Sequence, residues 1–270
     1  MARLRILVTG GTGFLAPFVV RVAQALGHTV VTTSRSVGDV AIDLQGAGMV
    51  DAVLEAMAPD VVLHLAAMAR LADCEQDERA ATRINAEVPA RFAERIGARC
   101  VFVSTDLVFD GRAAPYAATA PVSPLSVYGA SKAYGEEQVR AHGGRVVRLP
   151  LLFGPDASGR GATASLRAQL QRGQRPSLFT NEYRSPMHAF DAAQALVALV
   201  ERPDGPVLLH VAGPERVSRW ELGQRFARVA GLDASALQAA ECQDPLRPRD
   251  VALVPCLPPS RSLDAMLADG

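Results

Sequence analysis

Lysine is almost missing from this chain of 270 residues. Lys132 is the only lysine, and the other 27 of the 28 basic residues are arginine. Acidic residues also number 28, so the formal net charge is zero. A chain without a basic excess has no electrostatic footprint for nucleic acid or for an anionic membrane. We therefore expect a small-molecule partner, with neither nucleic acid nor membrane.

Signals for disulfides, metal ions and membrane spans are missing as well. The four cysteines form no C-x-x-C pair, and neither they nor the five histidines show metal-ligand spacing. No uninterrupted apolar run approaches the ~18–20 residues needed to cross a bilayer. The chain starts at Met1 and reaches an apolar run at Leu4, which leaves no room for a signal peptide. These absences predict a cytoplasmic protein with reduced thiols and no metal site.

Short apolar runs alternate with helically spaced apolar residues through the first half of the chain. The runs lie at 4–8, 29–33, 61–65, 100–103 and 145–149, and the helical patterns at 14–26, 49–58 and 75–96. This alternation predicts an α/β fold with a doubly wound parallel sheet of the Rossmann type. The alternation weakens beyond Ser158. We expect a dinucleotide-binding Rossmann domain at 1–155 and, at 156–270, mainly a small substrate-binding lobe interleaved with the last Rossmann elements.

The first run ends in a glycine-rich turn, Thr9-Gly10-Gly11-Thr12-Gly13, which leads into a helical pattern. Gly10 permits a tight turn, and Gly13 lets backbone amides approach a pyrophosphate at the positive end of the helix. We place the amides of Phe14 and Leu15 in the same cofactor-binding turn. An ordinary strand-to-helix loop has a similar sequence, but in this context we favour dinucleotide binding.

The second run ends in Ser34-Arg35 and carries no acidic residue there. An NAD site usually places a carboxylate at this point, whereas an arginine suits the 2′-phosphate of NADP. We predict NADP(H), with NAD(H) as the alternative, and expect Asp43 and Leu44 to lie beside the adenine. A solvated arginine and a simple loop aspartate are the alternatives for Arg35 and Asp43.

Small or polar residues follow the next strands. Leu65, Ala66 and Ala67 leave room for a cofactor across the strand ends, Asn85 lies in the following helical stretch, and Thr105 ends the run at 100–103. Ligands of such sheets bind beyond the carboxyl ends of the strands, so these residues are predicted to line one crevice. Thr105 would hydrogen-bond a substrate carbonyl; its alternative role is a turn cap.

The unique lysine follows Tyr128 by four residues, with Ser126 as the expected helix N-cap. This spacing places Tyr128 and Lys132 on one helix face, one turn apart. A unit charge ~4 Å away at an effective dielectric constant of ~20 is worth roughly 4 kcal/mol, or about three pKa units. We therefore expect Lys132 to lower the pKa of the Tyr128 phenol towards ~7, so that it can transfer a proton. A chance pairing on the surface is the alternative.

These residues together resemble the extended short-chain dehydrogenase/reductase family. The stretch from Val103 to Gly111, the approach Pro124-Leu125-Ser126-Val127-Tyr128-Gly129 and the later Arg247-Pro248-Arg249-Asp250 are similar to its dTDP-4-dehydrorhamnose reductase branch. Leu107 departs from the aromatic residue usual at its position. The loop at 68–73 departs from the commoner polar pattern.

The resemblance implies that Thr105, Tyr128 and Lys132 form a catalytic triad in an NAD(P)-dependent oxidoreductase. The implied reaction is NADP(H)-dependent reduction of a 4-keto group on a nucleotide-linked deoxysugar, with Tyr128 as proton donor. Arg184 and Arg247 are candidate clamps for the substrate pyrophosphate, because arginine binds phosphate oxygens in a bidentate manner; a solvated arginine is the alternative for each.

Three matters stay open at this point. The same triad also serves sugar-nucleotide epimerases and dehydratases, and the branch includes a non-catalytic, NADP-binding regulatory subunit. Family members are often dimers, which makes a homodimer an expectation, although the sequence shows no apolar seam for one.

Overall fold

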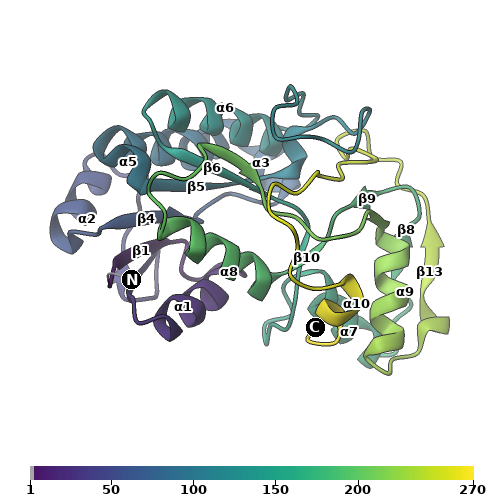
Figure 1. The fold of residues 1–270 in the computed structure, drawn as a ribbon. Coiled ribbons are helices and arrows are strands. Elements are labelled where there is room, and N and C mark those ends of the chain that lie inside the picture. The colour runs from purple at the N-terminus through teal and green to yellow at the C-terminus, as the bar shows by residue number, and fades with distance from the viewer. Residues whose placement is uncertain (1–2) are drawn as a thin grey trace.

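A seven-stranded parallel sheet forms the centre of the molecule (Figure 1). The computed structural model describes residues 3–270; Met1 and Ala2, which bear on the signal-peptide expectation, lie outside the described residues. The strand order is β11-β6-β5-β4-β1-β2-β3, and all neighbours are parallel. The predicted doubly wound Rossmann sheet is therefore confirmed. Its strands are β1 (Arg5–Thr9), β2 (Thr29–Ser34), β3 (Val40–Ala41), β4 (Val61–His64), β5 (Cys100–Thr105), β6 (Arg145–Leu149) and β11 (Leu208–His210).

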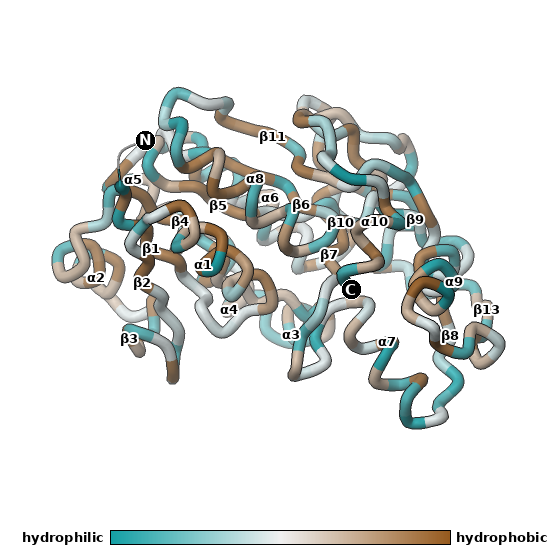
Figure 2. Tube along the Cα trace, turned by 60° about the horizontal axis from the view of Figure 1, so that its bottom comes forward, coloured by the Kyte–Doolittle hydropathy of each residue, from teal (hydrophilic) through white to brown (hydrophobic). Residues whose placement is uncertain are grey.

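Helices cover both faces of this sheet, and the residues of β1 show how. Ile6 and Val8 pack in the apolar cluster with α1 and α8, whereas Leu7 joins the opposite cluster with residues of α2 and α5. Successive strand residues point to opposite faces, so a strand buried on both sides is apolar throughout. The brown central strands in Figure 2 show this pattern. The covering helices are α1 (Ala16–Ala25) and α8 (Ala189–Val200) on one face, and α2 (Met49–Met57), α5 (Val88–Ile96) and α6 (Val127–Ala141) on the other.

The single helix expected within 75–96 is divided in the structure. α3 (Leu71–Gln76) ends before Asp77, whose side chain accepts a 2.9 Å hydrogen bond from Ala80 N and caps α4 (Glu78–Thr82). A π-helical turn, η1 (Arg83–Glu87), then leads into α5. Pro89 lies in the first turn of α5. Because proline has no N–H to donate one turn back, regular α-helical bonding cannot continue through it.

A smaller lobe lies beside the carboxyl end of the sheet (Figure 1). Ser218 and Glu221 form a capping box at the start of one of its helices. β11 and α8 come from the second half of the chain but belong to the main sheet and its cover, and the domain division at 155 stays a prediction. The lobe contains β7 (Leu152–Phe153), α7 (Ala162–Gln171), β8 (Ser177–Phe179), β9 (Tyr183–Arg184), β10 (Met187–His188), β12 (Val217–Ser218), α9 (Arg219–Val229), β13 (Gln238–Ala240) and α10 (Leu263–Leu267).

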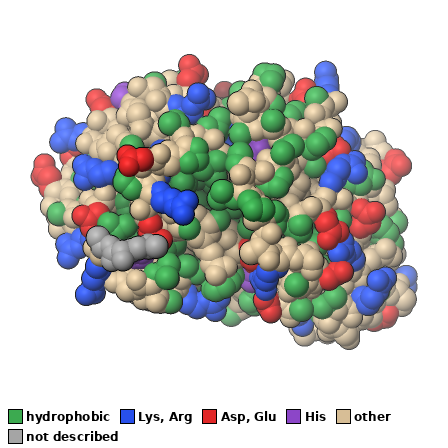
Figure 3. All heavy atoms as spheres, viewed as in Figure 1, with side chains coloured by type: hydrophobic (Ala, Val, Ile, Leu, Met, Phe, Trp, Pro, Cys, Tyr) green, Lys and Arg blue, Asp and Glu red, His purple; other side chains and the backbone are tan. Residues whose placement is uncertain are grey.

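Charged side chains of both signs are spread over the face in Figure 3, and apolar side chains gather towards its middle. This distribution agrees with the zero net charge. Between residues 3 and 270, no helix has the length and apolar character to cross a bilayer.

Candidate active site

The glycine turn lies at the switch point of the sheet, between β1 and β4. Gly10 has a φ of +73°, and a Cβ there would lie 2.8 Å from the backbone of Ala66. Only glycine satisfies both conditions without strain. α1 begins just after the turn with no side-chain cap, no acidic residue in its first turn and Pro17 near its start. Its free N–H groups and positive dipole end fit a pyrophosphate.

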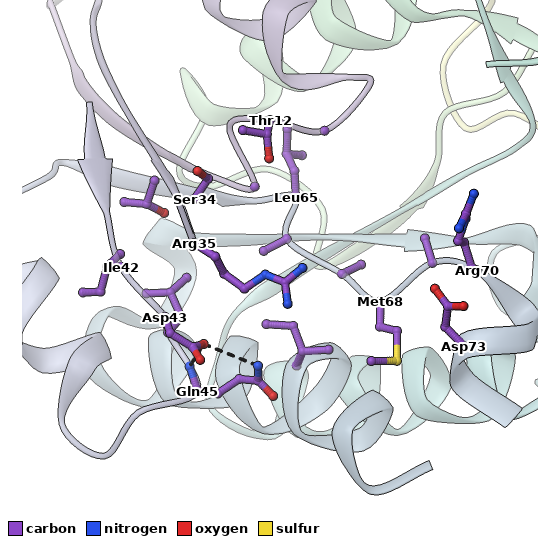
Figure 4. Close-up of a pocket in the computed structure, with 18 of the residues that line it drawn as sticks. Thr12, Ser34, Arg35, Ile42, Asp43, Gln45, Leu65, Met68, Arg70 and Asp73 are labelled. Carbon is purple, nitrogen blue, oxygen red and sulfur yellow. Dashed lines mark hydrogen bonds between the residues drawn. The ribbon is translucent and has the colours of Figure 1, made fainter. Parts of the chain in front are cut away.

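A cavity of about 860 Å³ opens beside this turn. Figure 4 shows Arg35 extending from the end of β2 into it, between the Ser34–Asp43 side and Met68. No carboxylate within the described chain forms an ion pair with Arg35, so its charge is available to an anion. Ser34 is less available, because its hydroxyl exchanges hydrogen bonds with the Val37 backbone. The predicted residues that line the cavity are Gly10, Gly13, Ser34, Arg35, Asp43, Leu44, Leu65, Ala66 and Ala67.

The other predicted cofactor contacts do not line this cavity; they are Phe14, Leu15, Asn85, Tyr128 and Lys132. Phe14 and Leu15 sit where the turn becomes α1, and the Leu15 side chain packs in the core. Asn85 is fully buried in the π turn. Its amide accepts from Met68 N at 2.9 Å and donates to Met68 O and to Ser131 Oγ at 3.0 and 2.9 Å. Asn85 thus ties the loop after β4 to α6, and its contact with the cofactor stays a prediction.

Tyr128 lies in the first turn of α6, and several contacts fix the position of that turn. The Ser126 hydroxyl accepts from Gly129 N at 3.1 Å, which confirms the predicted N-cap. Glu75 Oε1 accepts from Val127 N at 2.7 Å. A Cβ on Gly129 would lie 2.3 Å from Leu107 O, so the helix start packs directly on the segment after β5. The phenol of Tyr128 is thereby held close to the end of β5.

The expected lowering of the Tyr128 pKa is wrong for this structure. Burial raises the pKa of Tyr128 to about 12, and the nearby Asp106 carboxylate adds to this rise. The Thr105 side chain, by hydrogen bonding, and Arg184 act in the opposite direction. The phenol therefore stays protonated at neutral pH.

Lys132 is almost fully buried, with 2% of its surface exposed. Its Nζ donates to Val103 O at 2.7 Å and lies 3.9 Å from the centroid of the Phe102 ring. Burial lowers the pKa of Lys132 to about 7, while the Glu136 carboxylate opposes this fall. His64, on the neighbouring strand, has its pKa lowered to about 3 by burial and by the Lys132 charge, so it is neutral.

Thr105 ends β5 and is nearly buried. Its hydroxyl donates to Asp106 Oδ1 and accepts from Leu107 N, both at 3.2 Å. The cap alternative is therefore present in the structure. The Thr105 side chain also lies near enough to the Tyr128 phenol to lower its pKa. Thr105 and Tyr128 are thus brought together, although they are separated by 23 positions in the sequence.

Arg184 and Arg247 occupy the lobe side of the site, and both are already paired. Arg184 is buried and donates to the two oxygens of Asp106 at 2.7 Å each. Arg247 is about one-third exposed and donates to Glu182 Oε2 at 2.8 and 2.9 Å. Neither is the free phosphate clamp that the sequence suggested. Each would have to share or exchange a carboxylate partner to hold an anion.

Sequence reasoning missed three residues near these groups. Arg219 begins α9, has a buried Nη1 without a partner in the described chain, and lies near Glu182. Glu136 and Arg148 form a buried ion pair behind Lys132. The one available signal was spacing, since Glu136 follows Lys132 by four residues. No group of three or more acidic, histidine or cysteine side chains that could hold a metal ion occurs within residues 3–270.

Comparison with known proteins places this site in a family. The family model of the RmlD substrate binding domain matches residues 4–253. The chain is 30% identical over 247 residues to methionine adenosyltransferase 2 subunit beta of Danio rerio, across 86% of this chain and 76% of that protein. It is 29% identical over 237 residues to a probable dTDP-4,6-dihydroxy-2-methyloxan-3-one 4-ketoreductase of Streptomyces antibioticus, across 85% and 78% of the two chains.

The fold matches solved structures over nearly its whole length. A dTDP-4-dehydrorhamnose reductase of Bacillus anthracis str. Ames, in complex with NADP, aligns with a TM-score of 0.88 at 19% identity and covers 98% of both chains. Solved structures of this fold bind NADP or NAD. The expected resemblance is confirmed, and the chain belongs to the RmlD substrate-binding domain family of extended short-chain dehydrogenases/reductases.

Proposed function

We propose that this protein is an NADP(H)-dependent reductase of a 4-keto group on a nucleotide-linked deoxysugar. The observation that supports it most is the convergence at the end of β5. The Thr105 side chain lies near enough to the Tyr128 phenol to lower its pKa, and Lys132 Nζ donates to the carbonyl of Val103, two residues before Thr105. A proton donor, a hydroxyl partner and an ammonium group thus surround one strand end.

The cofactor side of the proposal rests on the turn after β1 and on Arg35. The uncapped start of α1 would hold the pyrophosphate, and Arg35 would hold the 2′-phosphate, which favours NADP(H) over NAD(H). When bound, the nicotinamide supplies the hydride that reduces the carbonyl. Lys132 has three N–H donors and gives one to Val103 O, so donors remain for ribose hydroxyls.

The protonation state of Tyr128 fits the direction of reduction. A phenol whose pKa lies at about 12 carries its proton at pH 7 and can donate it to a developing alkoxide. Thr105 donates or accepts at the same oxygen and orients it. These residues therefore act as proton donor and carbonyl orienter, without needing the anionic phenolate.

Positive charge on the lobe side favours an anionic substrate. Arg184, Arg219 and Arg247 lie around one carboxylate, Glu182, with Asp106 as the second acidic partner of Arg184. Three guanidinium groups against two carboxylates leave an excess of one positive charge. Pyrophosphate oxygens would use the free Nη1 of Arg219 and share Arg247, which matches a nucleotide-linked substrate.

The test is to follow NADPH absorbance with the purified protein against a panel of nucleotide-linked 4-keto-6-deoxysugars. Stoichiometric NADPH consumption with one of them supports a reductase. Conversion of a sugar nucleotide without net NADPH consumption would replace the proposal by an epimerase or dehydratase. Each outcome is read from the same reaction, because product and cofactor are quantified together.

A second candidate is a nucleotide-binding regulatory subunit, favoured by the 30% identity to methionine adenosyltransferase 2 subunit beta. This candidate requires NADP(H) binding without turnover of any keto sugar. Co-purification with a larger enzyme, whose activity changes when this chain is added back, would support it. Turnover that is lost in Tyr128→Phe would exclude it.

A further inference from the structure

Behind the ammonium group of Lys132 lies a buried polar network that the proposed mechanism does not use. Glu136 follows Lys132 by one turn of α6 and is 2% exposed. Its Oε1 accepts from Ser104 Oγ at 2.5 Å and from Arg148 Nε at 2.9 Å, and its Oε2 accepts from Arg148 Nη2 at 2.6 Å. The carboxylate is therefore held by β5 and β6 at once.

Arg148 is itself fixed on its far side. Its Nη1 donates to Ala118 O at 3.1 Å and to His210 Nε2 at 3.2 Å, and its guanidinium lies over the Phe109 ring. Burial and the Arg148 charge lower the pKa of His210 to about 4, so His210 stays neutral and accepts this bond. The ion pair therefore cannot swing away from α6.

The network reaches Lys132 through adjacent residues of β5. Val103 O accepts the Lys132 ammonium, and the next residue, Ser104, donates to Glu136. No direct Lys132–Glu136 ion pair forms in the described chain, so the carboxylate acts on the ammonium through space. Phe102, below Lys132, contributes only the face of its ring.

We propose that Glu136 is a positioning residue: held by Arg148 and Ser104 one helical turn from Lys132, it places a fixed negative charge behind the buried ammonium that bonds the strand end where Tyr128 and Thr105 meet. This inference rests on the proposed function of Lys132 in the site. It concerns a residue that touches neither the phenol nor the cofactor cavity.

The charges around Lys132 identify Glu136 as the one that favours its protonated form. Glu136 raises the pKa of Lys132, whereas burial lowers it. His64 is neutral and offers no negative charge. The titratable and charged groups on the elements packed around Lys132 are His64 on β4, Cys74 and Glu75 on α3, Asp106 after β5, Tyr128, Glu136 and Glu137 on α6, Arg148 on β6, and Arg184 on β9.

Because Lys132 is the only lysine, its titration can be observed directly. Labelling with lysine carrying ¹³C at Cε gives one side-chain resonance, and its chemical shift against pH reports the protonation of Nζ without any substrate. The wild-type midpoint is expected near 7. In Glu136→Gln it is expected about one to two pH units lower, the effect of losing a unit charge about one helical turn away at an effective dielectric constant of about 20.

Glu136→Gln leaves Arg148 buried without its partner and can fail to fold. The double variant Glu136→Gln/Arg148→Met removes both charges, and its midpoint is expected to fall by a similar amount. Glu137→Gln is the matched control, since Glu137 is the exposed neighbour on the same helix; its midpoint should stay within a few tenths of a pH unit.

Two results would overturn the inference. An unchanged Lys132 midpoint in the folded double variant, with only a lower melting temperature, would make Glu136 purely structural. If the Lys132 midpoint fell as far in Glu137→Gln as in Glu136→Gln, any negative charge on α6 would have the same effect, and Glu136 would have no special role. Both readings are independent of turnover, so failure of the reductase proposal and failure of this inference are distinguishable.

Discussion

The arginines on the Rossmann side of the site and those on its lobe side, here called the two walls, are held in opposite ways. On the Rossmann side, Arg35 reaches into the cavity without an acidic partner in the described chain (Figure 4). On the lobe side, Arg184 and Arg247 are both held by carboxylates. An anion binding at Arg35 displaces only water. An anion binding at the lobe must compete with Asp106 or Glu182, so its binding is coupled to a rearrangement of ion pairs.

We call the Rossmann side the prepared wall, because Arg35 is free to bind an anion there. We call the lobe side the adjustable wall, because its arginines must first give up a carboxylate partner. The backbone amides of the glycine turn and one free arginine give the cofactor wall a fixed shape. The lobe wall carries more charge but keeps it neutralised, and buried arginines remain tolerable there because each has a partner. Variants that remove charge from one wall at a time should therefore have different consequences.

The largest expected effect lies where the two walls meet, at Tyr128. Tyr128→Phe removes the proton donor and should cut turnover by about 10²–10⁴-fold while cofactor binding survives. Steady-state NADPH oxidation measures the first quantity, and NADPH fluorescence titration measures the second. Tyr134→Phe, an exposed tyrosine on the same helix, is the control and should leave both unchanged. Undiminished turnover in Tyr128→Phe would remove it from the mechanism.

Removing a charge from the adjustable wall should mainly lower the stability of the fold. Arg184→Met leaves Asp106 buried and unpaired, which typically costs about 3–5 kcal/mol and lowers the melting temperature by on the order of 10 °C. Thermal unfolding followed by circular dichroism measures this loss. Arg216→Met breaks a half-exposed ion pair with Asp250 and should cost less than about 1 kcal/mol. Equal losses in the two variants would contradict the buried role of Arg184.

Removing the charge of Arg35 from the prepared wall should lower the affinity for NADPH without changing stability. Arg35→Ala removes the expected contact with the 2′-phosphate and should weaken NADPH binding about 10–100-fold, with little change for NADH. The melting temperature should stay the same, because Arg35 is exposed and unpaired in the described chain. Arg70→Ala, at the other end of the cavity in Figure 4, serves as control. An equal loss for NADPH and NADH would disprove phosphate recognition by Arg35.

The same contrast explains how far the sequence could be interpreted. Local features were predictable: β6 spans the same residues as its apolar run, and Ser126 caps α6 as expected. The glycine turn was predictable from its glycines, because Gly10 has a positive φ, although the Ala66 backbone that packs against Gly10 is distant in the chain. The prepared wall is made almost entirely of such features, and it was therefore the more predictable one.

Features that depend on distant pairs were not predictable. Arg184 meets Asp106 across 78 positions, and Asn85 meets Ser131 across 46. No local sequence pattern predicts which of the 27 arginines will form an ion pair with a carboxylate. The prediction of a lowered Tyr128 pKa was wrong for the same reason. Helical spacing correctly placed Tyr128 and Lys132 on one face of α6. The Lys132 ammonium, however, donates to Val103 O, and burial of Tyr128 raises the pKa of its phenol.

The smallest expected effect is a pH dependence of NADPH affinity that comes from the charge of Lys132. A lysine whose pKa is lowered to about 7 carries its charge below that pH and loses it above. NADPH affinity should therefore fall about three- to tenfold as the pH rises from 6 to 8, because a neutral amine is a weaker donor to ribose hydroxyls than an ammonium. Fluorescence titration at each pH measures this change. The 2′-phosphate gains charge over the same interval, so Lys132→Met serves as the baseline.

Stability should move the other way over the alkaline side of this range. The unfolded lysine keeps its proton up to about pH 10.4, whereas the folded one releases it near 7, so above pH 7 the unfolded state binds more protons. The free energy of unfolding should therefore rise with pH between about 7 and 8.5. Thermal melts of wild type and Lys132→Met give this difference. Parallel pH trends in the two proteins would show that Lys132 is not buried as a charge, and a wild type that gains stability while losing cofactor affinity would show that one ammonium group links the two walls.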